Sequence, residues 1–192
     1  MRYPGSQVLS SPNFEAGRAA AISHAVFHTT EGPLEASLNT LSDQFRTPAE
    51  GGRVSAHYVV GPAGEIYSLV EDQDTAWHVR GRNSDTIGIE IVGWADDPSS
   101  WNPQNIAALS ALVGWLSTTY GVPLVYQATP EEPPTARGFV SHHALDPSRR
   151  SDPGPYFPWE EIKRGAGGEA LGGLGAVALL LAFVALAWSL TR

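Results

Sequence analysis

The sequence predicts a mixed α/β fold, in which helices flank a central β-sheet, with one membrane-spanning helix at the C-terminal end. Three observations predict this fold. Runs of β-forming residues alternate with segments that repeat apolar residues at helical spacing. Turns rich in glycine and proline separate these segments. An uncharged apolar run closes the sequence, and 192 residues suffice for one working domain with such an appendage.

Five runs are expected to be strands, each bounded by turn residues or by a helical segment. They cover residues 22–28, 54–60, 65–70, 86–92 and 138–141. A helix is expected over 33–46, because apolar residues recur there on one face. These residues are Leu34, Leu38, Leu41 and Phe45. A longer helix is expected over 103–120, because Asn102 is a good N-cap and Pro103 suits the first helical position.

Composition divides the chain into four parts. They are an N-terminal extension (1–20), the working domain (21–162), a glycine-rich linker (163–173) and a membrane-spanning helix (174–191). No charge occurs from Ala170 to Thr191, and a spanning helix needs about 20 such residues. A buried core helix is the alternative, but it normally shows a polar face and this segment has none. The expected location is therefore a membrane, with a single C-terminal anchor.

The topology of this anchor is less defined. The N-terminus lacks the apolar region of a secretory signal, so export by that route is not expected. Lys163 and Arg164 precede the apolar run and only Arg192 follows it, which weakly places the working domain in the cytoplasm. The side of the membrane on which the domain acts stays open.

The charge balance is acidic, with 12 Lys and Arg against 20 Asp and Glu and a net charge of -8. No basic run is interleaved with aromatic residues, so nucleic acid is not an expected partner. A monomer is expected. Because the sequence has no cysteine, any metal must be held by histidine, aspartate or glutamate.

Three residues form a candidate metal site. His28 ends an expected strand, and His142 and Asp152 flank a loop further along the chain. Three protein ligands with one open position are typical of catalytic zinc. A lone histidine on a strand is more often structural, and this spacing is spread over the whole domain. The set is therefore a hypothesis that depends on the fold bringing the strand end and the loop together.

Glu90 interrupts an otherwise apolar strand. Burying its charge costs several kcal/mol unless the side chain faces a polar cleft or a metal. One interpretation is an ion pair with Arg82 or Arg150. The other is a general base that takes a proton from the attacking water and returns it to the leaving amine.

Several segments together resemble a known family. They are VFHTT (26–30), SAHYVV (55–60) followed by GEIY, AWHVRGRN (76–83), TIGIEIVG (86–93) and SHHALDPSRRSDPGPYFPW (141–159). In this order and spacing they resemble the type 2 zinc amidases, which include phage T7 lysozyme, the bacterial AmpD amidases and the animal peptidoglycan recognition proteins. The resemblance covers about residues 20–162.

The resemblance implies a zinc ion held by His28, His142 and Asp152 in a cleft of the mixed sheet. It also implies that Glu90 is the catalytic acid or base, as in the AmpD-like branch. The T7-like branch instead has a tyrosine where this chain has Ala56. The chain therefore sides with the glutamate branch.

Further site residues follow from the same resemblance. Arg150 stands where the family usually has a lysine that stabilises an oxyanion, and arginine keeps the charge on a planar, forked group. Trp77, His78 and Asn83 match a cleft-lining stretch and are expected to touch glycan or stem peptide, with core packing as the alternative for the aromatic ring. Thr29 is expected to donate a hydrogen bond at the mouth of the site.

The implied function is zinc-dependent hydrolysis of the amide between N-acetylmuramic acid and L-alanine in peptidoglycan. A phage lysis enzyme is the favoured setting. Two alternatives stay open. One is an amidase that recycles soluble muropeptides, which would not need a membrane tail. The other is a non-catalytic peptidoglycan-binding module, although such modules commonly lack a metal ligand and here all three positions are filled.

Overall fold

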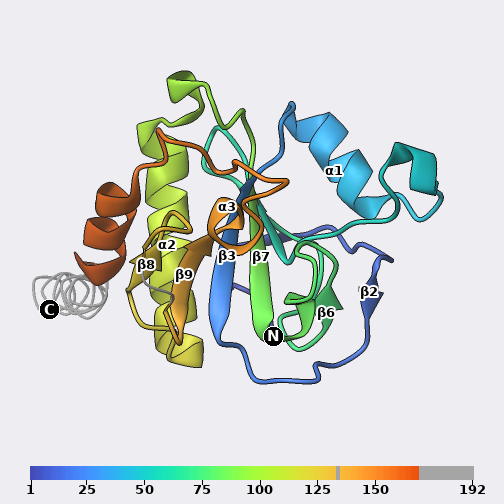
Figure 1. The fold of residues 1–192 in the computed structure, drawn as a ribbon, viewed down its shortest axis with the longest axis horizontal. Helices are drawn as coiled ribbons and strands as arrows, with labels where there is room; N and C mark the ends of the chain where they lie inside the picture. The colour runs from blue at the N-terminus through green and yellow to red at the C-terminus, as the bar shows by residue number, and fades with distance from the viewer. Residues whose placement is uncertain (133–134, 169–192) are drawn as a thin grey trace, which may run out of the picture.

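The computed structural model describes residues 1–132 and 135–168, which fold around a seven-stranded sheet (Figure 1). In spatial order the strands are β1 (Gln7–Val8), β5 (Ile66–Ser68), β4 (Tyr58–Val60), β7 (Thr86–Ile91), β3 (His24–Thr29), β9 (Gly138–Ser141) and β8 (Tyr126–Gln127). Neighbouring strands are parallel except β4 and β5, which form the expected antiparallel hairpin. The predicted mixed sheet is confirmed.

β3 and β7 pair side by side in the middle of the sheet. Successive side chains of a strand point to opposite faces. Phe27 and Ile89 therefore enter the core between the sheet and α2, whereas His28 and Glu90 point to the other face. His28 and Glu90 are also register partners, so two chemically active side chains lie next to each other.

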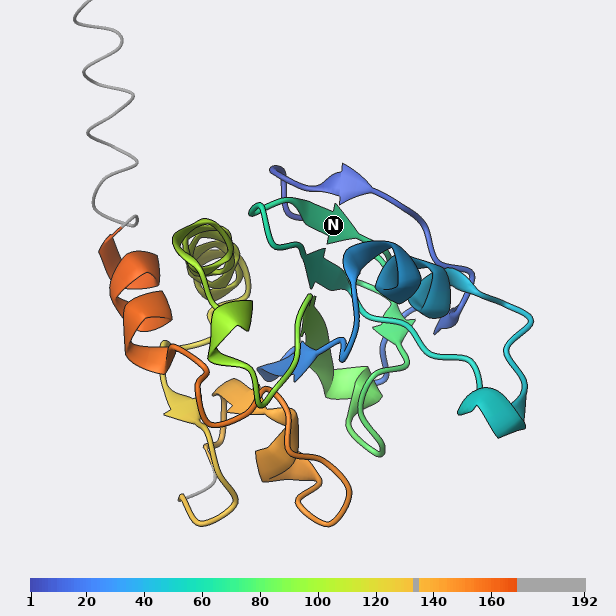
Figure 2. The same cartoon turned by 90° about the horizontal axis from the view of Figure 1, so that it is seen from above.

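α2 (Pro103–Tyr120) covers the apolar face of the sheet (Figure 2). It begins as predicted, because the side-chain oxygen of Asn102 accepts hydrogen bonds from the N–H groups of Gln104 and Asn105. It ends at Gly121, whose φ of 62° is the left-handed conformation common after a helix. Four of its residues are buried in the core, namely Leu109, Leu112, Val113 and Leu116.

Residues 159–168 are helical and lie beside α2 (Figure 2). Ile162 and Ala166 are buried in the same core as α2. A Cβ atom at Gly114 would lie 3.1 Å from the carbonyl oxygen of Ala166, so the small residue lets the two segments approach closely. The glycine-rich linker expected over 163–173 overlaps this helical segment at residues 163–168.

α1 (Leu34–Ser42) lies over the opposite face of the sheet, where Leu41 packs in a small cluster with Val59. The predicted helix was longer than the observed one. It stops because Asp43 is extended and its side chain accepts a hydrogen bond from the N–H of Phe45, 2.8 Å away. Phe45 is 80% exposed, so its expected place on the packed face is wrong.

The N-terminal residues belong to the sheets. β1 pairs with β5, and β2 (Phe14–Glu15) pairs with β6 (Thr75–Ala76) in a second, two-stranded sheet. The remaining elements are short. They are the 3-10 helices η1 (Pro48–Glu50), η2 (Asn83–Asp85) and η3 (Pro98–Ser100), and the single-turn helix α3 (His142–Leu145).

The expected membrane-spanning helix and membrane location require correction. Within residues 1–132 and 135–168, no helix has both the length and the apolar composition to cross a membrane. The run at 174–191 on which the expectation rested lies outside the described residues. The expectation rested only on the length and the lack of charge of that run. The fold class of the described residues is the mixed α/β domain.

Candidate functional site

The candidate site lies where the carboxyl ends of three parallel strands meet. His28 and Glu90 are each the second-last residue of their strands, β3 and β7, and His142 directly follows β9. Open sheets commonly bind ligands at this edge, because loops leave the strands there in different directions. The strand order therefore places three residues from distant parts of the sequence together.

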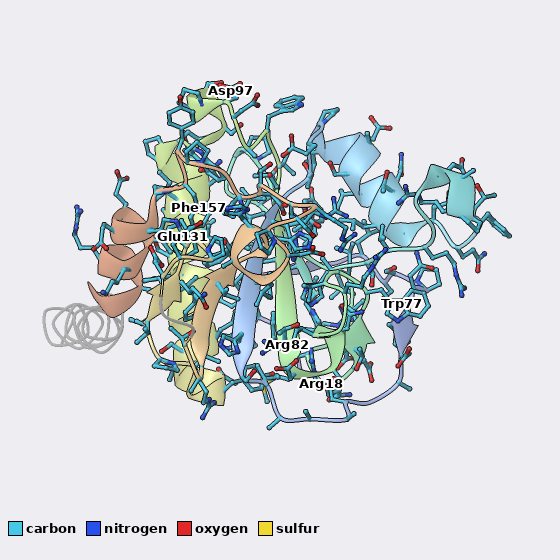
Figure 3. The ribbon with its side chains drawn as sticks, in the orientation of Figure 1. Arg18, Trp77, Arg82, Asp97, Glu131 and Phe157 are labelled. Carbon is cyan, nitrogen blue, oxygen red and sulfur yellow. The ribbon has the colours of Figure 1, made fainter. Side chains whose placement is uncertain are left out.

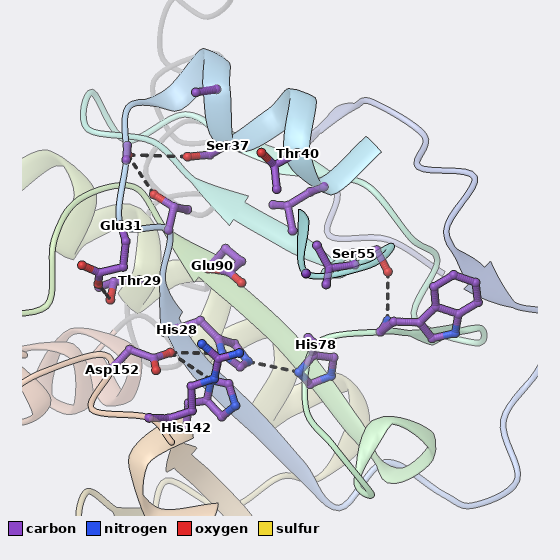
Figure 4. Close-up of a pocket in the computed structure, with 18 of the residues that line it drawn as sticks. His28, Thr29, Glu31, Ser37, Thr40, Ser55, His78, Glu90, His142 and Asp152 are labelled. Atoms are coloured by element: carbon purple, nitrogen blue, oxygen red, sulfur yellow. Dashed lines mark hydrogen bonds and ion pairs between the residues drawn. The ribbon is translucent and has the colours of Figure 1, made fainter. Parts of the chain in front are cut away.

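His28, His142 and Asp152 present one donor atom each to a common point (Figure 4). The Nδ1 atoms of the two histidines are 2.8 Å apart, and Asp152 Oδ2 lies 3.2 Å from His28 Nδ1 and 3.1 Å from His142 Nδ1. Tetrahedral zinc with bonds of about 2.0 Å needs donors about 3.3 Å apart. The three residues therefore have the chemistry and the spacing to hold a metal ion of this size.

The loop from His142 to Asp152 is held closed by local hydrogen bonds. The hydroxyl of Ser141 caps α3 by accepting a hydrogen bond from the N–H of Ala144, 2.8 Å away, which fixes the backbone at His142. The N–H of His143 donates to the carbonyl oxygen of Asp152 at 3.0 Å, and its Nδ1 lies 2.6 Å from the carbonyl oxygen of Arg150. His143 thus braces the loop that carries Asp152.

The protonation states suit a metal site. Burial lowers the pKa of His28 despite the neighbouring carboxylate of Asp152, so the imidazole stays neutral. Burial alone would raise the pKa of Asp152, but its contacts with the imidazoles of His142 and His28 outweigh burial and hold that pKa well below its ordinary value. A neutral imidazole and an ionised carboxylate are the forms that bind metals.

Glu90 lines the same cleft without an ion pair in the described part of the chain. Its Oε2 atom is buried and has no hydrogen-bond partner there. Arg82, one expected partner, lies at the amino ends of the strands (Figure 3), where its Nη2 is 2.6 Å from Asp85 Oδ2. Burial, and then the charge of Asp152, raises the pKa of Glu90 well above its ordinary value. Such a carboxylate is a stronger base than an exposed one.

A cleft of about 650 Å³ extends from the three donor residues toward α1. Arg150 lines it and is exposed. Thr29 also lines it, and its hydroxyl donates to Glu31 Oε1 at 2.6 Å (Figure 4). Trp77 also lines the cleft and is half-buried, and the guanidinium of Arg53 lies 5.0 Å from its ring centroid. Eight predicted site residues therefore line one cleft, namely His28, Thr29, Trp77, His78, Glu90, His142, Arg150 and Asp152.

Asn83 does not line the cleft but holds the backbone of His78, which does. Its side-chain oxygen accepts hydrogen bonds from the backbone N–H of His78 at 3.1 Å and of Val79 at 2.8 Å. His78 in turn faces His28, with its Nδ1 3.1 Å from His28 Nε2. The sequence expectation of substrate contact remains untested for both residues.

Two charged cleft residues were not expected from the sequence. Glu31 adopts a positive φ of 51°, and its carboxylate accepts hydrogen bonds from Thr29 and from the N–H of Ala95. Arg46 reaches the cleft from the segment that follows α1. The turn after residue 30 was visible in the sequence, but no local pattern marked either side chain as part of the site.

The sequence matches the family model described as N-acetylmuramoyl-L-alanine amidase over residues 18–155. It is 30% identical to N-acetylmuramoyl-L-alanine amidase A of Achromobacter lyticus over 172 residues, covering 83% of this chain and 92% of that protein. It is 31% identical to the amidase AmiD of Escherichia coli over 160 residues, covering 71% of this chain and 50% of AmiD. The chain thus spans about half the length of AmiD.

Solved structures share the fold. A structure of an AmpD derivative aligns with a TM-score of 0.66 and 24% identity, over 85% of this chain and 95% of that one. The complex of Escherichia coli AmiD with anhydro-N-acetylmuramic acid-L-Ala-D-gamma-Glu-L-Lys aligns with a TM-score of 0.59 and 29% identity, over 77% of this chain and 59% of that one.

Proposed function

The chain belongs to the N-acetylmuramoyl-L-alanine amidase family, and on that premise we propose that its cleft hydrolyses the amide between N-acetylmuramic acid and L-alanine with the help of a zinc ion. The adjacency of Glu90 to the three donor residues is the observation that carries this proposal. Burying the Glu90 carboxylate without a hydrogen-bond partner among the described residues costs free energy. Catalysis would account for that cost, whereas binding alone would not require the carboxylate.

His28, His142 and Asp152 would hold the zinc ion. A zinc ion held there supplies Lewis acidity toward the amide carbonyl and toward the attacking water. The neutral His28 and the ionised Asp152 need no change of protonation to act as ligands. The brace at His143 keeps the loop closed, which keeps Asp152 within reach of both histidines.

Glu90 acts as the general base and then as the general acid. Its buried Oε2 has no competing hydrogen-bond donor in the described residues, so it can accept a proton from a water in the cleft. The raised pKa of Glu90 then favours keeping that proton until the nitrogen of the leaving L-alanine accepts it.

Arg150 would stabilise negative charge on the carbonyl oxygen. It lines the cleft on the segment that leads to Asp152, and its charge already acts on Glu90. A guanidinium that meets developing charge in a cleft lowers the barrier without moving a proton. Trp77 and Thr29 would contact the substrate further along the cleft.

Peptidoglycan is the proposed substrate, and a cleft of about 650 Å³ has room for part of a muramyl peptide. The AmiD complex holds such a fragment, and its protein shares 29% identity with this chain. An amidase acting on intact wall and one recycling soluble muropeptides both fit this cleft. The phage lysis role expected from the sequence stays a prediction.

Product analysis tests the proposal. The zinc-loaded full chain is incubated in parallel with purified peptidoglycan and with a soluble anhydromuropeptide, and the products are identified by mass spectrometry. The proposal predicts free stem peptides that begin with L-alanine. Release from the soluble substrate alone would favour recycling. Binding to peptidoglycan without release of peptide from either substrate would overturn the amidase assignment and favour the binding module.

A further inference from the structure

We propose that His78 is a positioning residue that fixes the ring proton of His28 on Nε2 and so leaves the lone pair of His28 Nδ1 free for the metal. The proposal deepens the proposed function and rests on its metal site. His78 would thus act on the metal site through His28, which it contacts in the cleft lining.

The role follows from a chain of hydrogen bonds that begins at a backbone carbonyl. The oxygen of Arg82 can only accept, and the hydroxyl of Thr86 donates its single proton to it at 2.6 Å. Thr86 Oγ1 lies 3.1 Å from His78 Nε2, so this contact requires the proton on His78 Nε2. The other nitrogen of a neutral His78 ring is then an acceptor.

The direction of the next bond is thereby fixed. His78 Nδ1 lies 3.1 Å from His28 Nε2, and two bare nitrogens at this distance would repel each other. His28 therefore carries its proton on Nε2 and donates it to His78. His28 Nδ1 is left with a lone pair. Without metal, this lone pair accepts a hydrogen bond from His142 Nδ1 at 2.8 Å, and the same N–H lies 3.1 Å from Asp152 Oδ2. A metal ion at this point would replace that proton. Metal-binding histidines commonly have their other nitrogen held in this way.

The surroundings of His78 hold its ring in place. Asn83 fixes the backbone by accepting hydrogen bonds from His78 and its neighbour Val79. The ring rests on β7 at Gly88, where a Cβ atom would overlap it. The glycine at this position has an ordinary strand conformation, so its use here is to make room for the ring. Rotation of the ring would break both the bond to Thr86 and the bond to His28.

The first test reads the tautomer directly. Nitrogen-15 correlation spectra of the labelled full chain, free of metal and at neutral pH, distinguish protonated from bare ring nitrogens. We expect His28 protonated at Nε2 and His78 protonated at Nε2. A spectrum with the proton of His28 on Nδ1 would overturn the proposal. This spectrum requires neither zinc nor amidase activity, so its result is independent of whether the proposed function is correct.

The second test measures zinc affinity by competition with a chelator. His78→Phe keeps a ring over Gly88 but removes both nitrogens, and we expect it to weaken zinc binding about 10- to 100-fold. Thr86→Val removes only the hydroxyl and should weaken binding less, in the same direction. Thr40→Val, also in the cleft lining, is the matched control and should bind zinc normally.

The outcomes separate the two proposals. Unchanged zinc affinity in both His78→Phe and Thr86→Val would overturn the positioning role even if the enzyme is active. A chain that binds no zinc at all would overturn the proposed metal site. The tautomer spectrum would still decide whether His78 fixes the ring proton of His28 on Nε2. Folding of each variant is checked by its amide spectrum, and Thr86→Val serves if His78→Phe does not fold.

Discussion

Acid should destabilise the fold through His57, which is fully buried directly before β4. Its Nδ1 accepts a hydrogen bond from the N–H of Gly88 at 2.9 Å, and its Nε2 lies 3.2 Å from the carbonyl oxygen of Asp74. Burial, followed by the positive charge of Arg18, lowers the pKa of His57 to about 3 from an ordinary value of 6.5. The folded protein thus keeps His57 neutral at a pH where the unfolded chain protonates it.

This difference gives the size and sign of the effect. Between the two pKa values the unfolded chain binds the extra proton, so the free energy of unfolding falls as the pH falls from about 6.5 toward 3. Each pH unit well inside this window costs about 1.4 kcal/mol. From pH 7 to pH 5 the contribution of His57 should therefore fall by about 2 kcal/mol.

Urea unfolding of the metal-free chain at pH 7, 6 and 5 measures this loss. His57→Asn is the matched variant, because its side-chain oxygen can accept the hydrogen bond from Gly88 and does not titrate. Other buried histidines contribute to both proteins, so the difference in pH dependence isolates His57. The wild-type chain should lose about 2 kcal/mol more than the variant. Equal losses in the two proteins would refute the assignment.

Three further substitutions test the core, the loop and the cleft. Leu112→Ala should lower the free energy of unfolding by about 2–5 kcal/mol, measured in urea, because Leu112 is fully buried in α2; a loss below about 1 kcal/mol would contradict that packing. Gly154→Ala should lower the free energy of unfolding by more than about 1 kcal/mol and weaken zinc binding. The reason is that φ at Gly154 is 88° and a Cβ atom there would overlap the carbonyl oxygen of Ala95. Wild-type stability and zinc affinity in this variant would contradict the prediction. Arg150→Ala should lower kcat for peptide release by about 10²–10³, with most activity kept in Arg150→Lys; an unchanged kcat would show that Arg150 does not act on the oxyanion.

Much of the site could be predicted because two of its residues stand out within their own strand segments. His28 ends a run of β-forming residues, and Glu90 breaks an apolar one, so each was visible in its own segment. Their adjacency depends on strand order, which periodicity does not contain. Asp152 is a residue of a proline-rich loop, and its approach to His142 was implied by family resemblance rather than by spacing.

Other features depend on tertiary packing that the sequence did not reveal. Gly165 and Ala166 belong to the expected glycine-rich linker, yet they lie in a helical segment that packs on α2. Phe45 fits a helical pattern, but Asp43 ends the helix first. The hydrogen bonds of His78 pass through Thr86 and the carbonyl of Arg82, and such a chain becomes visible only in three dimensions.

The central claim is that Glu90 works with a metal at His28, His142 and Asp152 to hydrolyse the muramyl amide, and one measurement tests it most directly. Wild-type chain and Glu90→Gln are loaded to equal zinc content, and the rate of release of L-alanine-terminated peptides from peptidoglycan is measured with and without zinc. The account predicts that release requires zinc, and that Glu90→Gln lowers kcat by about 10²–10⁴ while zinc content is unchanged. Full activity of the variant, or release from metal-free wild-type protein, would contradict it.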